Sequence, residues 1–129
     1  MAGTSPVIRP AGKTAALSVV ATSHAAVTLD TSIDSDAAYA ACLNPGSVAV
    51  AIQFSQNGVA AVFPIDGTST GSFVLPPLME APVILPIPLT LAPPSGTTGN
   101  ASAVGPQVTA IGAAAGPTII YVTAITYQS

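Results

Sequence analysis

Few side chains of this 129-residue chain could do chemistry, and they are scattered. His24 is the only histidine, and the stretch ATSHAA around it supplies neither a nucleophile elbow nor a neighbouring carboxylate. Cys42 is the only cysteine, in an alternating apolar stretch where a free thiol usually behaves as a small buried hydrophobe. Glu80 is the only glutamate, without a second carboxylate nearby for glycosidase-type acid-base catalysis. We therefore expect no enzymatic activity, no catalytic residue and no cofactor.

Three aspartates lie close together in the stretch LDTSIDSDAA, at Asp30, Asp34 and Asp36. Clustered carboxylates can hold Ca²⁺ when backbone oxygens complete the ligand set. The spacing lacks the glycine and the final glutamate of an EF-hand loop, so we favour a solvated acidic turn and expect no metal site. A phosphate loop is also excluded, because GNASAVG is followed by Pro106 and a strand pattern.

The composition restricts the class of protein more than any motif does. Charged residues make up 5% of the chain and hydrophobic residues 50%, whereas soluble proteins carry about 25% charged residues. No apolar window of about 18 to 20 residues free of proline and glycine exists, which argues against a membrane protein. The first 13 residues lack the apolar core of a secretory signal, so we expect synthesis in a cytoplasm. With Arg9 and Lys13 as the only cations and a net charge of −3, nucleic acid is not an expected partner.

The elements that must position these residues are β-strands, because proline or glycine interrupts every helical pattern. The stretch SVAVAIQF places Val48, Val50, Ile52 and Phe54 on one face. The turn NPG at 44–46 predicts a hairpin with residues 37–44, in which Tyr39, Ala41 and Leu43 share a face. A second hairpin is predicted at Asn57-Gly58, leading into residues 59–64. Together these patterns predict a three-stranded meander.

Further strands are predicted at 15–22, 25–30, 71–76, 107–113 and 117–126. About eight or nine short strands predict an all-β fold, a two-sheet antiparallel sandwich of jelly-roll-like form. We expect one domain over residues 14–129, with a long exposed loop at about 93–106 and an extended arm at 1–13. Phe54 and Tyr121 fall at alternating positions typical of a core, which leaves few aromatic residues for a carbohydrate-binding platform.

The segment EAPVILPIPLTLAPP, residues 80–94, is too apolar for a loop and too rich in proline for a central strand. Pro82, Pro86 and Pro88 have the same parity, so all three missing N–H donors face the same lateral edge of a strand. This predicts an edge strand whose open side is blocked and whose odd residues enter the core. The even residues, among them Pro82, Ile84, Pro86, Pro88 and Ala92, are expected to meet a neighbouring subunit, with a polyproline arm as the competing geometry.

The N-terminal arm carries both cations of the chain. Pro6 and Pro10 favour extended backbone over helix there. We expect Arg9 and Lys13 to meet carboxylates of a neighbouring subunit or of a larger assembly, the alternative being a frayed terminus.

Three stretches, LNPGSVAVAIQFSQNG, GSFVLPPLMEAPV and VTAIGAAAGPTIIYVT, resemble a type of small virion protein of tailed bacteriophages. The resemblance spans residues 43–123, and the loop at 93–106 has no counterpart in it. It implies a β-sandwich capsid decoration, or cement, protein on the outer surface of the head, made in the host cytoplasm. Its expected partners are the major capsid protein and copies of itself. The alternatives are a tail or head-tail junction protein, or a glycan- or receptor-binding module on the virion.

Overall fold

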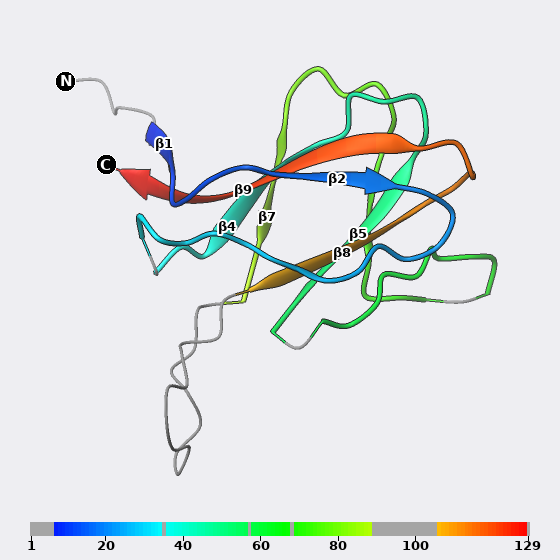
Figure 1. Cartoon of the computed structure of the whole chain (residues 1–129), viewed down its shortest axis with the longest axis horizontal. Coiled ribbons are helices and arrows are strands. Elements are labelled where there is room, and N and C mark those ends of the chain that lie inside the picture. Colours follow the sequence, from blue (N-terminus) through cyan, green and yellow to red (C-terminus); the bar gives the residue numbers. More distant parts are fainter. Residues whose placement is uncertain (1–6, 35, 57, 68, 89–105, 129) are drawn as a thin grey trace, which may run out of the picture.

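The computed structural model describes residues 7–34, 36–56, 58–67, 69–88 and 106–128, which form nine strands and no helix. The strands build two antiparallel sheets, and this confirms the predicted all-β, two-sheet sandwich (Figure 1). In chain order they are β1 (Val7–Pro10), β2 (Ala15–Val19), β3 (Val27–Thr28), β4 (Tyr39–Leu43), β5 (Val50–Ser55), β6 (Phe73–Leu75), β7 (Val83–Pro86), β8 (Gln107–Gly112) and β9 (Thr118–Gln128).

The first sheet is organised around β9, the longest strand. Its order is β1-β9-β4-β7, and β2 pairs with β9 on the same side as β1, so β1 and β2 follow one another along β9. Figure 1 shows β1 and the C-terminal end of β9 reaching out together at one end of the molecule. Of the expected N-terminal arm, Val7–Pro10 is therefore extended and paired along β9.

The second sheet has the order β3-β8-β5-β6. On β5 the predicted alternation is confirmed: Val50 and Ile52 are buried, and Phe54 packs against the core from a half-buried position. The two sheets share one hydrophobic core, to which Leu17, Val19, Ile52, Leu75, Val108, Ile120 and Val122 contribute large, fully buried side chains.

The predicted meander is wrong. β4 belongs to the first sheet and β5 to the second, so the NPG turn carries the chain from one sheet to the other. The buried side chain of Asn44 stabilises this crossing by donating to the carbonyl oxygens of Val48 (2.8 Å) and Pro76 (3.2 Å). Gly46 is required there because a Cβ atom would overlap with the side chain of Thr118.

Residues 59–64 form no strand, contrary to the hairpin expected after β5. The chain instead returns over the outer side of the second sheet and is held by side chains of the strands. The hydroxyl of Thr109 donates to the carbonyl oxygen of Val59 (2.7 Å), and the Val59 N–H donates to the Ser55 hydroxyl (2.9 Å). These side-chain bonds replace the ladder of a hairpin. Asn57 itself lies outside the described residues.

The proline-rich segment forms the predicted edge strand over Val83–Pro86, and the contact of its even residues with a neighbouring subunit stays a prediction. β7 is the last strand of the first sheet and pairs with β4 alone among the described strands. The N–H of Ile87 donates to the carbonyl oxygen of Ala38 (2.9 Å), so the odd residues face β4 and the even residues face the open edge. Leu85 and Ile87 are buried, which confirms that the odd side chains enter the core. Residues 89–94 lie outside the described part.

The expected long loop at 93–106 also lies outside the described residues, except for Pro106. That residue is buried, and its carbonyl oxygen accepts a hydrogen bond of 2.8 Å from the N–H of Leu29.

Candidate functional site

In the described part of the chain, the residues that could do chemistry are not assembled into a catalytic centre. His24 makes a local contact of 2.7 Å between Nδ1 and the carbonyl oxygen of Ala25. Cys42 is buried in the core, as expected, and burial raises the pKa of its thiol to about 12. A thiol with so high a pKa is not a nucleophile at neutral pH.

The acidic turn bonds to the backbone. Asp30 accepts hydrogen bonds from the N–H groups of Lys13 (2.8 Å) and Ser32 (3.0 Å), and Asp34 accepts one from the N–H of Asp36 (2.9 Å). The bond from the Lys13 N–H, followed by those from Ser32, holds the pKa of Asp30 below its usual range. Within the described residues no group of three or more His, Cys, Asp or Glu side chains is placed to hold a metal ion.

The most distinctive surface is the outer face of the first sheet, which we call the tyrosine face. The strand registers place on it Ile8, Pro10, Ala16, Ser18, Tyr39, Ala41, Leu43, Ile84, Pro86, Ile119, Tyr121, Thr123, Ile125 and Tyr127. Of these residues Ile125 is buried, and the others are half-buried or exposed. Tyr39, Tyr121 and Tyr127 are 40%, 40% and 42% exposed, and Ile119 is 48% exposed. The face is therefore apolar and accessible.

Contacts within the tyrosine face hold its larger side chains in place. The rings of Tyr39 and Tyr127 meet edge to face, with centroids 5.3 Å apart and planes at 78°. The hydroxyls of Thr14 and Thr123 lie 2.6 Å apart and share a hydrogen bond. These contacts reduce the conformational freedom that the side chains would lose on binding a partner.

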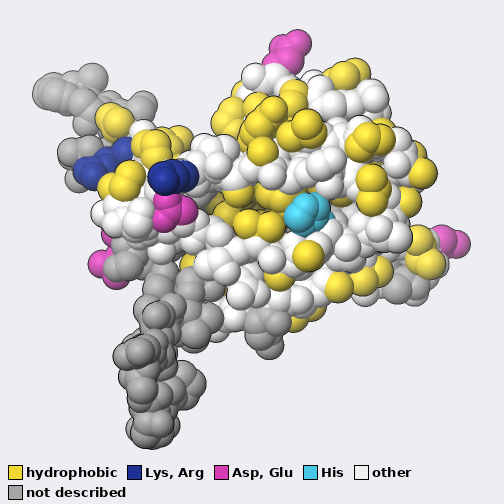
Figure 2. Space-filling view, viewed as in Figure 1, with side chains coloured by type: hydrophobic (Ala, Val, Ile, Leu, Met, Phe, Trp, Pro, Cys, Tyr) yellow, Lys and Arg dark blue, Asp and Glu magenta, His cyan; other side chains and the backbone are white. Residues whose placement is uncertain are grey.

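No charged residue belongs to the tyrosine face. Arg9 is the only charged residue within the described strands, and it pairs with Thr126, so it points to the other side of the sheet. Lys13 is exposed in the link between β1 and β2, next to Thr14, at the margin of the face. In Figure 2 the Lys and Arg side chains gather at the end of the molecule that carries β1, with acidic side chains beside them and others at distant edges of the view.

The predicted interface residues divide between this face and its border. Ile84 and Pro86 belong to the tyrosine face through their pairing with Ala41 and Tyr39. Pro82 is exposed just before β7, and Pro88 is half-buried just after it. The structure thus brings the proline strand and the tyrosines onto one surface, while Arg9 faces away.

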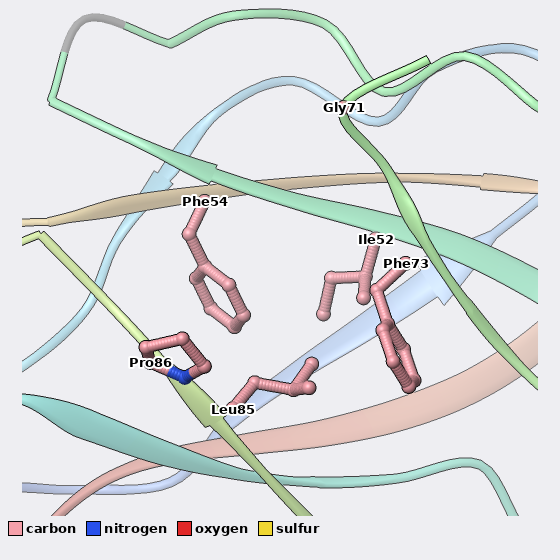
Figure 3. A pocket seen from close by; sticks show the side chains of 6 residues that line it. All are labelled: Ile52, Phe54, Gly71, Phe73, Leu85 and Pro86. Atoms are coloured by element: carbon pink, nitrogen blue, oxygen red, sulfur yellow. The ribbon is translucent and has the colours of Figure 1, made fainter. Parts of the chain in front are cut away.

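A pocket opens next to this surface, where the two sheets separate between β6 and β7. Its volume is about 220 Å³, and it is lined by Ile52, Phe54, Gly71, Phe73, Leu85 and Pro86. Figure 3 shows the rings of Phe54 and Phe73 on either side of Ile52, all directed toward Leu85 and Pro86 on β7. None of the six lining residues has a polar side chain.

The sequence pattern missed the most important members of both surfaces. Tyr121 was expected to occupy a core position, and this prediction is wrong: it faces outward from β9, because Ile120 and Val122 take the inner positions. The only available signal was that Tyr121 and Tyr127 have the same parity, since amphipathic rings prefer a surface with one wet side. Phe73 and Leu85 come from different sheets, so no local pattern joins them.

Comparison of the chain with family models, with curated proteins and with solved structures gives no match. The described residues also contain no helix that is long and apolar enough to cross a membrane.

Proposed function

We propose that the protein is a structural virion protein of a tailed phage, a decoration (cement) protein that binds the outside of the major capsid protein shell and stabilises the head. The observation that carries the proposal is the charge-free tyrosine face of the first sheet. The resemblance of the strand motifs to tailed-phage virion proteins supplies the type of particle.

The size of the tyrosine face supports a partner. With β1 and β2 counted as one row, four rows of about seven residues each give a sheet area of roughly 450 Å². Contiguous apolar patches larger than a few hundred Å² on soluble proteins usually mark interaction sites. Tyrosine is also enriched at binding hot spots, because its ring supplies apolar area with few rotatable bonds.

Sheet edges offer much poorer contact sites. The open side of β7 lacks the donors of Pro82 and Pro86, and the edge strands β3 and β6 of the second sheet have two and three residues. Strand addition at these three edges is thus disfavoured, which favours contact through a face. Face contacts repeated over a shell give strong attachment through multivalency even when each contact is weak.

Arg9 and Lys13 have a secondary role in this proposal. Both are exposed, and they lie at the end of the molecule where β1 and the end of β9 project. We infer that Lys13 meets a carboxylate of a neighbouring copy or of the shell at the margin of the contact, and that Arg9, which faces the other side of the sheet, meets one outside it. Their contribution is expected to be small and reduced by salt, as for other exposed ion pairs.

The test uses particles that lack the protein, to which the full chain is added. Tyr121→Asp places a charge in the centre of the tyrosine face and is expected to weaken attachment at least tenfold, since the charge would have to be desolvated. Ile65→Asp is the matched control, because Ile65 is 69% exposed in the segment between β5 and β6. It should bind within about twofold of the wild type.

Two further measurements show where the protein attaches to the particle and whether it stabilises the shell. Particle imaging should show a regular lattice on the head, and bound particles should resist heating better than bare ones. Signal confined to the tail or to the head-tail junction would replace the head assignment by one of those positions. Normal attachment of Tyr121→Asp would contradict the use of the tyrosine face.

A glycan-binding module is the second candidate, and the three exposed tyrosines on one sheet face favour it. Sugar-binding platforms present ring faces side by side, whereas the Tyr39 and Tyr127 rings stand at 78° to each other. A glycan array without binding would remove this candidate.

A further inference from the structure

Phe73 is an inward-facing aromatic residue that the fold leaves uncovered. Its partner on the neighbouring strand β5 is Ile52, which is 1% exposed. Both side chains therefore lie on the inner side of the second sheet. Phe73 is nevertheless 46% exposed, because β6 and β7 are edge strands of different sheets and no described strand closes the gap between them. The hydrophobic core is accessible at this edge, in the pocket of about 220 Å³ (Figure 3).

The backbone around the pocket cannot accept an added strand. The N–H of Ala113 donates to the carbonyl oxygen of Ala49, so the odd residues of β5 face β8 and Ile52 faces β6. It follows that Val74 alone in β6 turns its N–H and C=O toward the open edge. On β7 the corresponding positions are Ile84 and Pro86, and proline has no N–H. The pocket is therefore open to a side chain and closed to strand pairing.

We propose that this pocket binds one uncharged aromatic side chain of the partner protein, as an anchor beside the tyrosine face. The rings of Phe54 and Phe73 both line the pocket, so an inserted ring can contact an aromatic side chain there in stacked or edge-to-face geometry. All six lining side chains are apolar, so a charged occupant would find no side-chain partner there to offset the desolvation of its charge.

The volume sets the size of the occupant. A closed apolar cavity of about 150 Å³ accommodates benzene, and the present pocket is somewhat larger and open on one side. One ring with a short substituent fits, and an extended ligand does not. Pockets that bind free small molecules are usually larger, about 300 Å³ or more, and enclose most of the ligand.

The position of the pocket favours a partner protein over a free ligand. Pro86 lines the pocket and also belongs to the tyrosine face, so the two surfaces are continuous across β7. A protein that covers the face can insert a side chain into the pocket at the same time. The identification of that partner as the capsid shell rests on the proposed function, whereas the binding of an aromatic ring does not.

The first experiment tests the pocket alone, with toluene and p-cresol as analogues of phenylalanine and tyrosine side chains. In methyl NMR of the full chain we expect saturable shifts at Ile52 and Leu85, with a Kd on the order of 1 mM. Benzoate, the charged analogue, should give no saturable shift. Phe73→Ala should weaken toluene binding at least fivefold, and Val74→Ala, on the same strand but the opposite face, should leave it within about twofold.

A second variant guards against disruption of the edge strand. Phe54→Leu keeps most of the apolar volume but removes one of the two rings, and its spectrum reports directly whether the fold is intact. It too should weaken toluene binding. Absence of saturable shifts in the wild type, or equal binding by Phe73→Ala, would overturn the pocket proposal, even if the protein attaches normally to particles.

The second experiment tests the source of the side chain. In the particle assay Phe73→Ala is expected to bind at least fivefold more weakly than Val74→Ala. Saturable toluene binding combined with unchanged attachment of Phe73→Ala would overturn the assignment to a partner protein. If the wild type fails to bind any particle, the proposed function fails, and the toluene measurement still decides whether the pocket binds an aromatic ring.

Discussion

The hydroxyl of Thr118 donates a hydrogen bond of 3.3 Å to the side-chain oxygen of Asn44 in the buried interior of the sandwich. Asn44 follows β4, Thr118 begins β9, and the two residues are 74 positions apart. The amide of Asn44 also donates to the carbonyl oxygens of Val48 and Pro76, so one side chain joins four segments. Because the side chains of Asn44 and Thr118 are buried, loss of one partner would leave the other without its hydrogen bond.

We expect Asn44→Ala to lower the free energy of unfolding by about 3 kcal/mol, since the buried Asn44 side chain loses its hydrogen bonds to Val48, Pro76 and Thr118 together. Thr118→Val keeps the shape and removes only the hydroxyl, so its expected cost is about 1 kcal/mol. Urea denaturation measures both. The loss of stability in the double variant should be smaller than the sum of the losses in the two single variants. Strict additivity would show that the Thr118 hydrogen bond contributes nothing.

Leu78 has a left-handed backbone conformation, with φ at 58°. Such a conformation costs an L-residue about 1 to 2 kcal/mol, and the side chain gains little in return because it is 68% exposed. Asparagine tolerates this region better, so Leu78→Asn is expected to raise the free energy of unfolding by about 0.5 to 1 kcal/mol. Leu78→Val should lower it, because β-branched residues fit the region worst. A lower urea midpoint for Leu78→Asn would contradict the explanation.

Stability should depend on pH through Asp30, whose carboxylate accepts hydrogen bonds from the N–H groups of Lys13 and Ser32. These bonds lower its pKa from the ordinary 3.8. Since the folded-state pKa lies below the unfolded one, the stabilisation is complete above about pH 5 and disappears as the pH falls through both values. Asp30→Asn is thus expected to be less stable than the wild type at neutral pH, with a difference that closes in acid.

Urea midpoints measured over a pH series check this expectation. Asp66→Asn is the control, because it removes the same charge from an exposed loop. A difference between Asp30→Asn and the wild type that stayed constant down to about pH 2 would show that the hydrogen bonds do not favour the charged form.

The Cys42 thiol should be inert in the folded protein. Burial raises its pKa to about 12, so at pH 8 roughly one molecule in ten thousand carries the thiolate, far fewer than for a free cysteine. Iodoacetamide labelling, followed by mass spectrometry, is expected to be about a thousandfold slower than in denaturant. Labelling at the rate of a free thiol in native buffer would mean that β4 opens readily.

The sequence alone was sufficient for the features that depend on local backbone periodicity. Successive side chains of a strand point to opposite faces, so the inner face of β5 and the two faces of the proline strand could be predicted from parity. The blocked edge of β7 follows from the same rule, because the prolines at 82, 86 and 88 remove donors on one side only.

Local turn chemistry failed where distant contacts decided the pairing. The NPG turn after β4 has the residues of a hairpin, yet Asn44 is bonded to Pro76 and Thr118, which lie far along the chain. These buried hydrogen bonds, together with the pairing of β4 with β9, place β4 and β5 in different sheets.

What the sequence determined by itself is that this chain forms short strands, with little charge and with a proline-blocked edge, because these properties depend on composition and on the two-residue period of a strand. Only the tertiary structure decided which face of β9 is inner and which strands lie beside one another. Parity cannot make that choice, since both faces of β9 are apolar. Packing decided which face of β9 is inner, because it buries Ile120 and Val122 and leaves Tyr121 outside. The arrangement of the sheets likewise leaves Phe73 half-exposed beside β7.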